Sequence, residues 1–172
     1  MEARSRPRPI PAVRSCIWRR CCAISFTTAT TTVSRAGVIL ERVIGRSGDW
    51  LRQAQADLEL ARHARAGGRH EWACFAAQQA AEKAVKGVHP GLGQDAWGHS
   101  VTELLDALRD RVEVGEPLLD RGRALDKLYV PTRYPNGLPS GAPADYYTAA
   151  EAGHAIADAE AVIAFCTGVL SR

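Results

Sequence analysis

The sequence EWACFAAQQAAEKAVKGV, residues 71–88, decides the fold of this 172-residue chain. Its apolar side chains recur at spacings of three and four residues, which is the period of a helix with one buried side. The residues predicted to face inward are Trp72, Phe75, Ala76, Ala80, Ala84 and Val88. We predict that the helix stops at His89-Pro90-Gly91, because proline and glycine are the residue types that most often end helices.

One helix is predicted before this segment, over residues 49–65. Asp49 can cap its N-terminus, and apolar residues follow at helical spacing. These are Trp50, Ala54, Leu58 and Ala61. The pair Gly67-Gly68 separates the two helices, and a connection this short implies that they are antiparallel neighbours.

Three further helices are predicted after residue 91. One begins at Ser100, where Ser100 and Glu103 have the spacing of a capping box, in which each residue binds the other's backbone amide. The second begins near Pro117, because proline is tolerated in a first helical turn. The last begins at a second capping box, Thr148 with Glu151. Its apolar stripe is Ala152, Ile156, Ala159, Ile163, Cys166 and Leu170.

A loop over residues 130–147 precedes the last helix and contains four prolines. No stretch of the chain shows the alternation typical of a strand. We therefore predict an all-α, up-and-down antiparallel bundle of about five helices, with a long Pro-rich loop before the last one. Long loops in compact domains are usually functional, so this loop is the predicted working surface.

Residues 1–46 differ from the rest of the chain and are predicted to be a disordered Arg/Thr-rich leader before a bundle at 47–172. They contain nine Arg and two Glu, whereas the remainder contains 13 basic and 17 acidic residues. The basic pI therefore gives no indication of a nucleic-acid binder. Three interpretations stay open: an export signal around Arg19-Arg20, an RNA-binding arm, or a tail that includes an extension from a start codon chosen too far upstream.

The cysteines and the hydropathy pattern indicate a cytoplasmic location with no membrane segment. Cys74 and Cys166 lie at apolar helical positions, and no cysteine spacing is typical of disulfides or zinc ligands. No uncharged run reaches the roughly 18–20 residues that cross a bilayer. Since Gly-rich phosphate loops and nucleotidyltransferase signatures are also missing, we expect no cofactor and no nucleotide transfer by this chain.

Four segments together resemble the HEPN-domain protein family, over about residues 48–170. They are FAAQQAAEKAVK at 75–86, GHS at 98–100, LDKLYVPTRYP at 125–135 and YYT-x-x-EA at 146–152. The resemblance implies a helical bundle that is usually a homodimer. It also implies a minimal nucleotidyltransferase as a possible partner, in some cases as a toxin–antitoxin pair.

The same resemblance implies a possible ribonuclease activity. The family members with this activity have a signature of an Arg followed after four to six residues by His. Two such motifs meet across the dimer to form a metal-independent site. Arg133 lies in the corresponding region, but the next histidine, His154, is much too far along the chain. The spacing does occur from Arg65 to His70, at the end of the first helix, where we interpret it as accidental. Without a histidine near Arg133, the ribonuclease interpretation is weakened.

Lysine is rare in this chain, and two of its three lysines lie on the helix at 71–88. Helical spacing places Lys83 and Lys86 on one polar strip with Gln79 and Glu82. One interpretation is a solvated face with ion pairs such as Glu82 with Lys86. The other is a phosphate or nucleotide site that these lysines share with Arg133.

Arg133 is the main candidate site residue of the Pro-rich loop. Its guanidinium suits bidentate phosphate contact, and the neighbouring Tyr134 can stack on a base. Alternatively, Arg133 anchors the loop by pairing with Asp126 or Glu82. His99 is placed near the same polar face by the family resemblance, although as a neighbour of a helix cap it needs no function.

Three functions are consistent with these residues. The preferred one is a HEPN-type binding module that dimerises, partners a nucleotidyltransferase and binds nucleotide or RNA phosphate. The second is a divergent metal-independent ribonuclease toxin that uses Arg133. The third is a purely structural interaction protein.

Overall fold

The structure is a computed structural model that describes residues 35–172, with side chains from residue 46 onward. Its elements are α1 (Arg35–Ala66), α2 (His70–Gly91), α3 (Val101–Asp106), α4 (Glu116–Asp126), the 3-10 turn η1 (Pro135–Gly137), α5 (Pro143–Tyr146) and α6 (Ala149–Leu170). No strand occurs in this range, so the predicted all-α class is confirmed. The predictions for residues 1–34 fall outside the described part of the chain.

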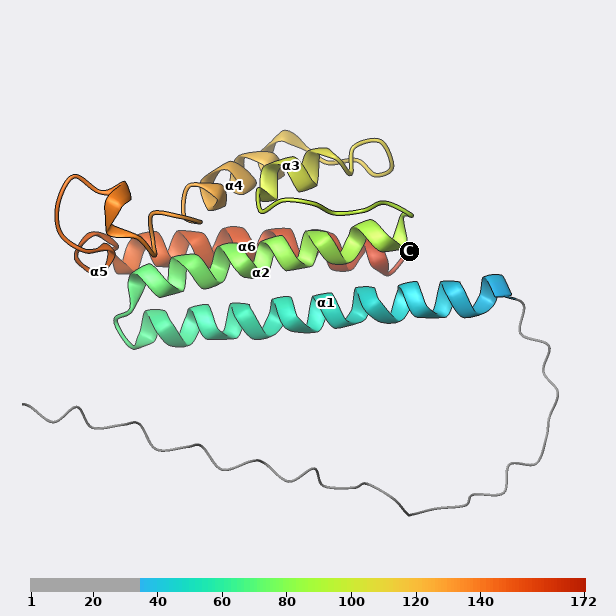
Figure 1. Ribbon diagram of the computed structural model, residues 1–172, viewed down its shortest axis with the longest axis horizontal. Helices are drawn as coiled ribbons and strands as arrows, with labels where there is room; N and C mark the ends of the chain where they lie inside the picture. The colour runs from blue at the N-terminus through green and yellow to red at the C-terminus, as the bar shows by residue number, and fades with distance from the viewer. Residues whose placement is uncertain (1–34) are drawn as a thin grey trace, which may run out of the picture. The chain divides into compact units, whose positions relative to one another are not determined.

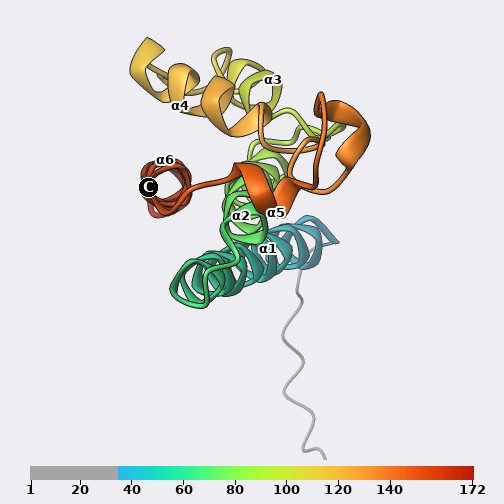
Figure 2. The same ribbon diagram turned by 90° about the vertical axis from the view of Figure 1, so that its left-hand side faces the viewer.

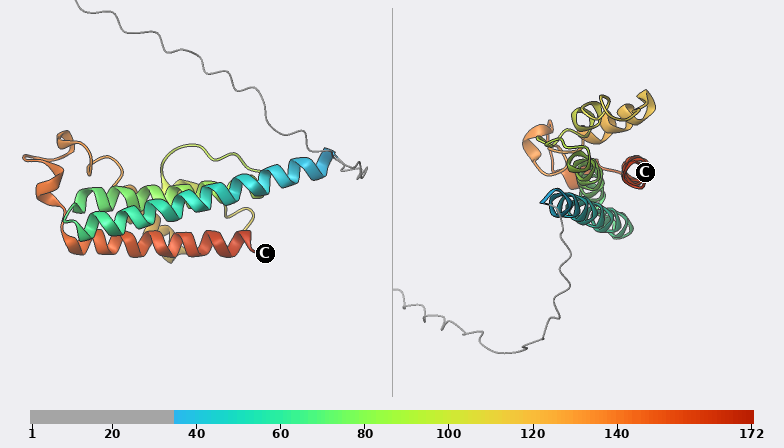
Figure 3. Two further views of the ribbon diagram at one scale, coloured as in Figure 1. Left: turned by 90° about the horizontal axis from the view of Figure 1, so that it is seen from below. Right: turned by 90° about the vertical axis from the view of Figure 1, so that its right-hand side faces the viewer.

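Helix α2 lies at the centre of the bundle. It packs against α1 on one side, against α3 and α4 on the opposite side, and against α6 (Figure 2). The chain reverses between α1 and α2, as the short Gly67-Gly68 connection predicts (Figure 1). Helix α6 runs in the same direction as α2, because α3, α4 and the Pro-rich loop carry the chain back between them (Figure 3).

The buried side of α2 explains why this segment decides the fold. Ala76, Ala80, Ala84 and Val88 are buried, as their spacing predicts. Small side chains at these positions let α1 and α6 approach the α2 backbone closely. The prediction that Trp72 faces inward is wrong, because its side chain is 52% exposed beside the α1–α2 contact.

Helices α1 and α2 are in close contact at Gly87. A Cβ atom added there would lie 2.9 Å from Cβ of Trp50 and 3.4 Å from the carbonyl oxygen of Ser47. This contact includes Ser47, which precedes the predicted start of the helix. The helix starts at Arg35, earlier than the predicted residue 49, so Asp49 is inside the helix and pairs with Arg52. Because the end of α2 packs over buried Ser47, α1 continues past Asp49 instead of ending there.

We expect Gly87→Val to destabilise the fold by about 1–3 kcal/mol, since an overpacked contact must push the two helices apart. Gly48→Ala on exposed α1 is the matched control, because no atom lies within 4 Å of its added Cβ. That change should stabilise the fold by about 0.5–1 kcal/mol through helix propensity. Urea unfolding measures both values, and equal effects of the two substitutions would contradict the close contact.

Helices α3 and α6 begin at the two predicted capping boxes, and only the second is complete. At α6, the amide of Glu151 donates to Oγ1 of Thr148 at 3.3 Å, and the amide of Thr148 donates to the Glu151 carboxylate at 2.8 Å. At α3, the amide of Glu103 donates to Oγ of Ser100 at 3.2 Å. Asp126 of α4, rather than Glu103, supplies the carboxylate at this helix start.

Asp126 holds the start of α3 through three hydrogen bonds. Its carboxylate accepts from Oγ of Ser100 at 2.7 Å and from the amides of Val101 at 2.6 Å and Thr102 at 3.1 Å. A carboxylate at a helix N-terminus satisfies amides that have no partner inside the helix. The interpretation of Asp126 as the ion-pair partner of Arg133 is therefore wrong.

The Pro-rich loop has structure of its own, in η1 and α5. Thr132 is buried, and its hydroxyl donates to the carbonyl oxygen of Leu128 at 2.6 Å. Pro143 is also buried, and α5 packs against α2. The loop thus contacts the bundle at both ends. Arg133 and Tyr134 directly follow Thr132, which is held in place by its burial and its hydrogen bond.

Among the described residues, α6 is the one helix that is long and apolar enough to cross a membrane, judged by length and composition alone. In this fold it is a core helix, with Ala152, Ala159 and Cys166 fully buried in the bundle. Its carboxylates pair with other helices, Asp158 with Arg121 at 2.7 Å and Glu160 with Arg62 at 2.7 Å.

Candidate functional site

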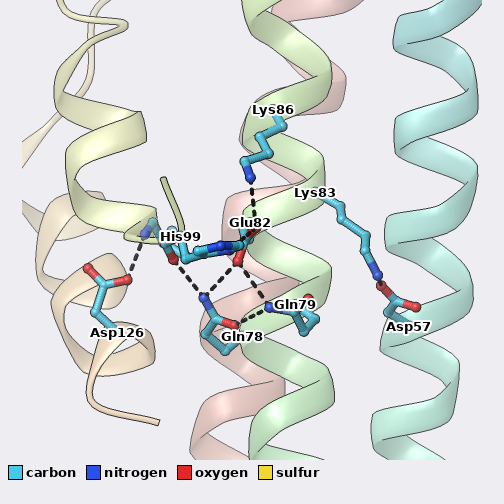
Figure 4. Close-up of polar contacts among 9 residues, drawn as sticks. Asp57, Gln78, Gln79, Glu82, Lys83, Lys86, His99 and Asp126 are labelled. Carbon is cyan, nitrogen blue, oxygen red and sulfur yellow. Dashed lines mark hydrogen bonds and ion pairs between the residues drawn. The ribbon is translucent and has the colours of Figure 1, made fainter. Parts of the chain in front are cut away.

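A buried carboxylate on α2, Glu82, is the centre of a polar network (Figure 4). Its Oε1 lies 2.9 Å from Nζ of Lys86 and 3.1 Å from Nδ1 of His99. Its Oε2 accepts from Nε2 of Gln79 at 3.0 Å and from Nε2 of Gln78 at 3.3 Å. The predicted Glu82–Lys86 ion pair is therefore present, but the Glu82 side chain is only 5% exposed, so the pair does not lie on a solvated face.

The sequence builds this network from helical spacing and one loop. Residues 78, 79 and 86 each lie three or four positions from residue 82, so their side chains lie on the same side of α2 as Glu82. The segment after α2 then returns along the helix and delivers His99. Nε2 of Gln78 donates to the carbonyl oxygen of His99 at 2.9 Å. Gly98 permits this return, because its φ of 88° lies in the region that favours glycine.

The side chain of Lys83 does not lie with the others on the predicted polar strip. It points away from the Glu82 network and pairs with Asp57 of α1 (Figure 4). Both side chains are largely buried, at 26% and 13% exposed. The structure therefore divides the two lysines, with Lys86 in the Glu82 network and Lys83 at the α1–α2 contact.

Arg133 is held by aromatic rings. The carbon at the centre of its guanidinium lies 4.5 Å from the ring centroid of Phe75, 4.6 Å from that of Tyr129 and 5.1 Å from that of Tyr134. Its Nε donates to the carbonyl oxygen of Tyr129 at 2.9 Å. No carboxylate of the described residues lies within 4.0 Å of it, so its predicted pairing with Glu82 is wrong as well.

Tyr129 joins the arginine to the Glu82 network. The ring of His99 stacks against the ring of Tyr129, with centroids 4.9 Å apart and planes 16° apart. Arg133, Tyr129, His99 and Glu82 therefore form one continuous group, although the chain separates them widely. The structure thus brings His99, Glu82 and Lys86 together with Arg133 and the half-exposed Tyr134, but not Lys83.

This arrangement suits the binding of an anion. A guanidinium has five N–H donors, and only the Nε–H of Arg133 has a partner among the described residues. Contact with rings attracts the cation without neutralising its charge. The planar donor group is therefore held in one direction, which is the condition for a two-point contact with a phosphate.

The other Arg–His spacing, Arg65 to His70, belongs to a different place. Nε of Arg65 donates to the carbonyl oxygen of Ala149 at 3.0 Å, and its guanidinium lies against Gly153. This contact ties the end of α1 to the start of α6. His70 is the first residue of α2, so the pair lies in a structural junction, consistent with an accidental match.

Neither buried thiol is suited to act as a nucleophile. Cys74 and Cys166 are free and fully buried. Burial raises the pKa of each to about 12, so both stay protonated near neutral pH. Among the described residues, no group of three or more His, Cys, Asp or Glu side chains is placed to hold a metal ion.

Buried His89 predicts a pH-dependent stability. Burial lowers its pKa below the ordinary 6.5, opposed by its hydrogen bond to the carbonyl oxygen of Leu104. The unfolded chain therefore binds more protons below about pH 6.5, so stability falls as the pH drops through the folded pKa. We expect a lower Tm at about pH 5.5 than at about pH 7.5.

The control for His89 is His154, which is exposed on α6. His89→Gln should flatten the pH dependence of Tm more than His154→Gln does. Thermal unfolding followed by circular dichroism measures both variants. An unchanged slope in His89→Gln would show that another group carries the dependence.

Sequence reasoning missed Phe75, a member of the site, and Asp57, the partner of Lys83. The apolar pattern assigns Phe75 to the core, although it stands four residues before Gln79 on the polar side of α2. This spacing is a signal that could have found it. Asp57 has no such signal, because only the packing of α1 on α2 places it beside Lys83.

Comparison with known proteins supports the same fold. The HEPN domain family model matches residues 47–169. The solved structure of TT1696 from Thermus thermophilus is 47% identical, with a TM-score of 0.71, covering 72% of this chain and 98% of that one. ST0689, described as an archaeal HEPN homologue, is 40% identical, with a TM-score of 0.63 and coverage of 73% and 98%.

A HEPN domain protein from Thermotoga maritima, tm0613, is 43% identical, with a TM-score of 0.60 and coverage of 72% and 98%. No curated protein matches the chain. The family match spans the whole bundle from the α1–α2 contact to the end of α6. On this sequence and structural likeness, the chain belongs to the HEPN domain family.

Proposed function

We propose that this chain is a binding module in which Arg133 contacts a phosphate group of a nucleotide or RNA. The observation that carries this proposal is the guanidinium held between Phe75, Tyr129 and Tyr134, without an ion-pair partner among the described residues. A charge that the fold positions and leaves unpaired is available to a ligand. Tyr134 is 50% exposed and can stack on a neighbouring base when the ligand is RNA.

The lysines have smaller roles in this proposal than the sequence suggests. Lys86 is paired with Glu82 and Lys83 with Asp57, so their charges are already compensated. Lys86 would contribute long-range attraction for the anion, and His99 would border the site through its stacking on Tyr129. The predicted ligand contacts are therefore Arg133 and Tyr134 first.

Calorimetric titration of the full chain with ATP and with a short single-stranded RNA tests the proposal. We expect saturable binding that weakens between about 50 and 200 mM salt, because phosphate binding releases counterions. The absence of binding to both ligands at the lower salt concentration would contradict the proposal. Binding that does not change with salt would contradict a phosphate contact.

We also propose that the chain dimerises and partners a separate nucleotidyltransferase in the cytoplasm. Large apolar side chains are exposed on the described part of the fold, and such residues are enriched at protein interfaces. Those outside the ligand surface are Trp97, Val130 and Tyr146. Light scattering should give the mass of a dimer. Co-purification with a nucleotidyltransferase encoded beside this chain should give a complex, and its failure to form would remove the partner from the account.

A metal-independent ribonuclease is the second candidate, and one observation favours it. His99 lies in the Arg133 cluster, with Nδ1 3.1 Å from Oε1 of Glu82 and the side chain 58% exposed. A histidine oriented by a carboxylate and open to solvent is the arrangement of a general base. The structure thus supplies near Arg133 a histidine that the local sequence spacing lacks.

A cleavage assay with labelled RNA in EDTA separates the two candidates. The binding module predicts RNA that is bound and recovered intact. Cleavage that His99→Ala and Arg133→Ala both abolish would establish the ribonuclease, as would growth arrest on expression that the same variants relieve. An unchanged cleavage rate in His99→Ala would exclude His99 as the base.

A further inference from the structure

A groove between α1 and α2 lies next to the Arg133 cluster. Its volume is about 290 Å³. Leu60 of α1 forms one apolar wall, and Trp72 and Phe75 of α2 form the other. Asp57, Gln79 and Lys83 lie at its polar side. The volume is near the lower end of about 300 Å³ for ligand pockets, which suits one planar ring system.

Two large apolar side chains that form the walls of this groove are exposed. Leu60 is 59% exposed and Trp72 is 52% exposed. The ring of Trp72 meets the ring of Phe75 edge-on, with centroids 6.0 Å apart and planes 75° apart. Exposed aromatic and aliphatic side chains line this groove. A flat, weakly polar group that binds against them leaves water, and this transfer is favourable in free energy.

Phe75 connects the groove to Arg133. Its ring lines the groove and also lies 4.5 Å from the centre of the Arg133 guanidinium. A ligand could therefore place a ring in the groove and an anionic group at Arg133, with the Phe75 side chain between the two.

The polar side of the groove offers a donor and an acceptor next to each other. They are the ammonium of Lys83 and the carboxylate of Asp57, which are paired with each other. Every nucleobase carries a donor and an acceptor side by side on its Watson–Crick edge, and proteins read bases by stacking plus hydrogen bonds to that edge. The groove thus combines an apolar slot with a matching polar pair.

We propose that the groove receives the base of the nucleotide whose phosphate contacts Arg133. This inference rests on the proposed function and names the part of the ligand that gives affinity beyond the charge. Trp72 and Leu60 enclose the base, and the Lys83–Asp57 pair faces its polar edge. The phosphate group then reaches Arg133 across the ring of Phe75.

Titration of the full chain with ATP and with inorganic tripolyphosphate tests this assignment. Trp72→Ala is expected to weaken ATP binding about five- to tenfold by removing a stacking surface. It should leave the affinity for tripolyphosphate unchanged, because that ligand has no base. Trp97→Ala is the matched control, since Trp97 is 84% exposed and does not line the groove. It should change neither affinity.

Leu60→Gln is a second variant on the opposite wall, and it should also weaken ATP selectively because it removes an apolar wall without adding a charge. Both side chains are more than half exposed, so neither change empties the core. An unchanged ATP affinity in Trp72→Ala would overturn the groove assignment, while the proposed function would stand if Arg133→Ala weakens both ligands. No binding of either ligand to the wild type would overturn both proposals. If Trp72→Ala changes the mass of the oligomer but not the ATP affinity, the groove is an interface between copies of this chain, and the assignment is overturned.

Discussion

Replacing Glu82 with leucine is expected to destabilise the fold by about 3–5 kcal/mol. The change leaves Lys86, whose side chain is 15% exposed, without its carboxylate partner. It also removes the acceptor for Nδ1 of His99 and for the amide groups of Gln78 and Gln79. A buried charge without a partner costs much more than the pair contributes, so the loss should exceed that from a surface ion pair. Equilibrium unfolding in urea measures it.

The double variant Glu82→Leu with Lys86→Met is the control for this prediction. It removes both charges, so it should recover much of the stability lost in the single variant. The two changes are therefore expected to be strongly non-additive in a double-mutant cycle. A loss below about 1 kcal/mol for Glu82→Leu, typical of an exposed pair, would contradict the buried network.

Replacing Arg133 with alanine is expected to weaken ATP and RNA binding by about tenfold to a hundredfold. The variant removes a charged, two-point contact with phosphate. Its effect on stability should be limited to about 1–2 kcal/mol, because the lost contacts are cation–π interactions and one hydrogen bond at a half-buried position. Calorimetric titration and urea unfolding of the same sample separate the two effects.

Two variants make the Arg133 prediction specific. Arg133→Lys keeps the charge but loses the planar group that stacks on the rings, so its affinity should be intermediate. Arg123→Ala removes an exposed arginine of α4 that pairs with Asp120, and it should leave binding unchanged. A large loss of stability in Arg133→Ala with unchanged ligand affinity would make Arg133 a loop anchor only.

The sequence predicts much of the fold because its strongest signals are local. The apolar spacing of α2 and the Thr148–Glu151 box at α6 are both contained within a few helical turns. The start of α1 is different, because the burial of Ser47 under the end of α2 extends the helix past a residue that can cap it. Asp126 is another case, since its role at α3 comes from the packing of two helices.

The candidate site is predicted less completely, for the same physical reason. Arg133, Tyr134, Glu82, Lys86 and His99 are identifiable from the sequence. Their connections are not, because they run through ring contacts between distant segments. Arg133 against Phe75 and His99 against Tyr129 depend on how the loop and the α2–α3 connection fold back onto α2. Residue types suggested ion pairs for Arg133, and the fold instead surrounds it with aromatic rings.

The most direct test of the central claim is the NMR signal of the Arg133 Nε–H group during titration with ATP. This group donates to the carbonyl oxygen of Tyr129, which should make its signal observable in the free protein. The account predicts a saturable shift of this signal that follows the calorimetric binding curve, with no shift for exposed Arg123. Saturable ATP binding that leaves the Arg133 signal unmoved would contradict the account.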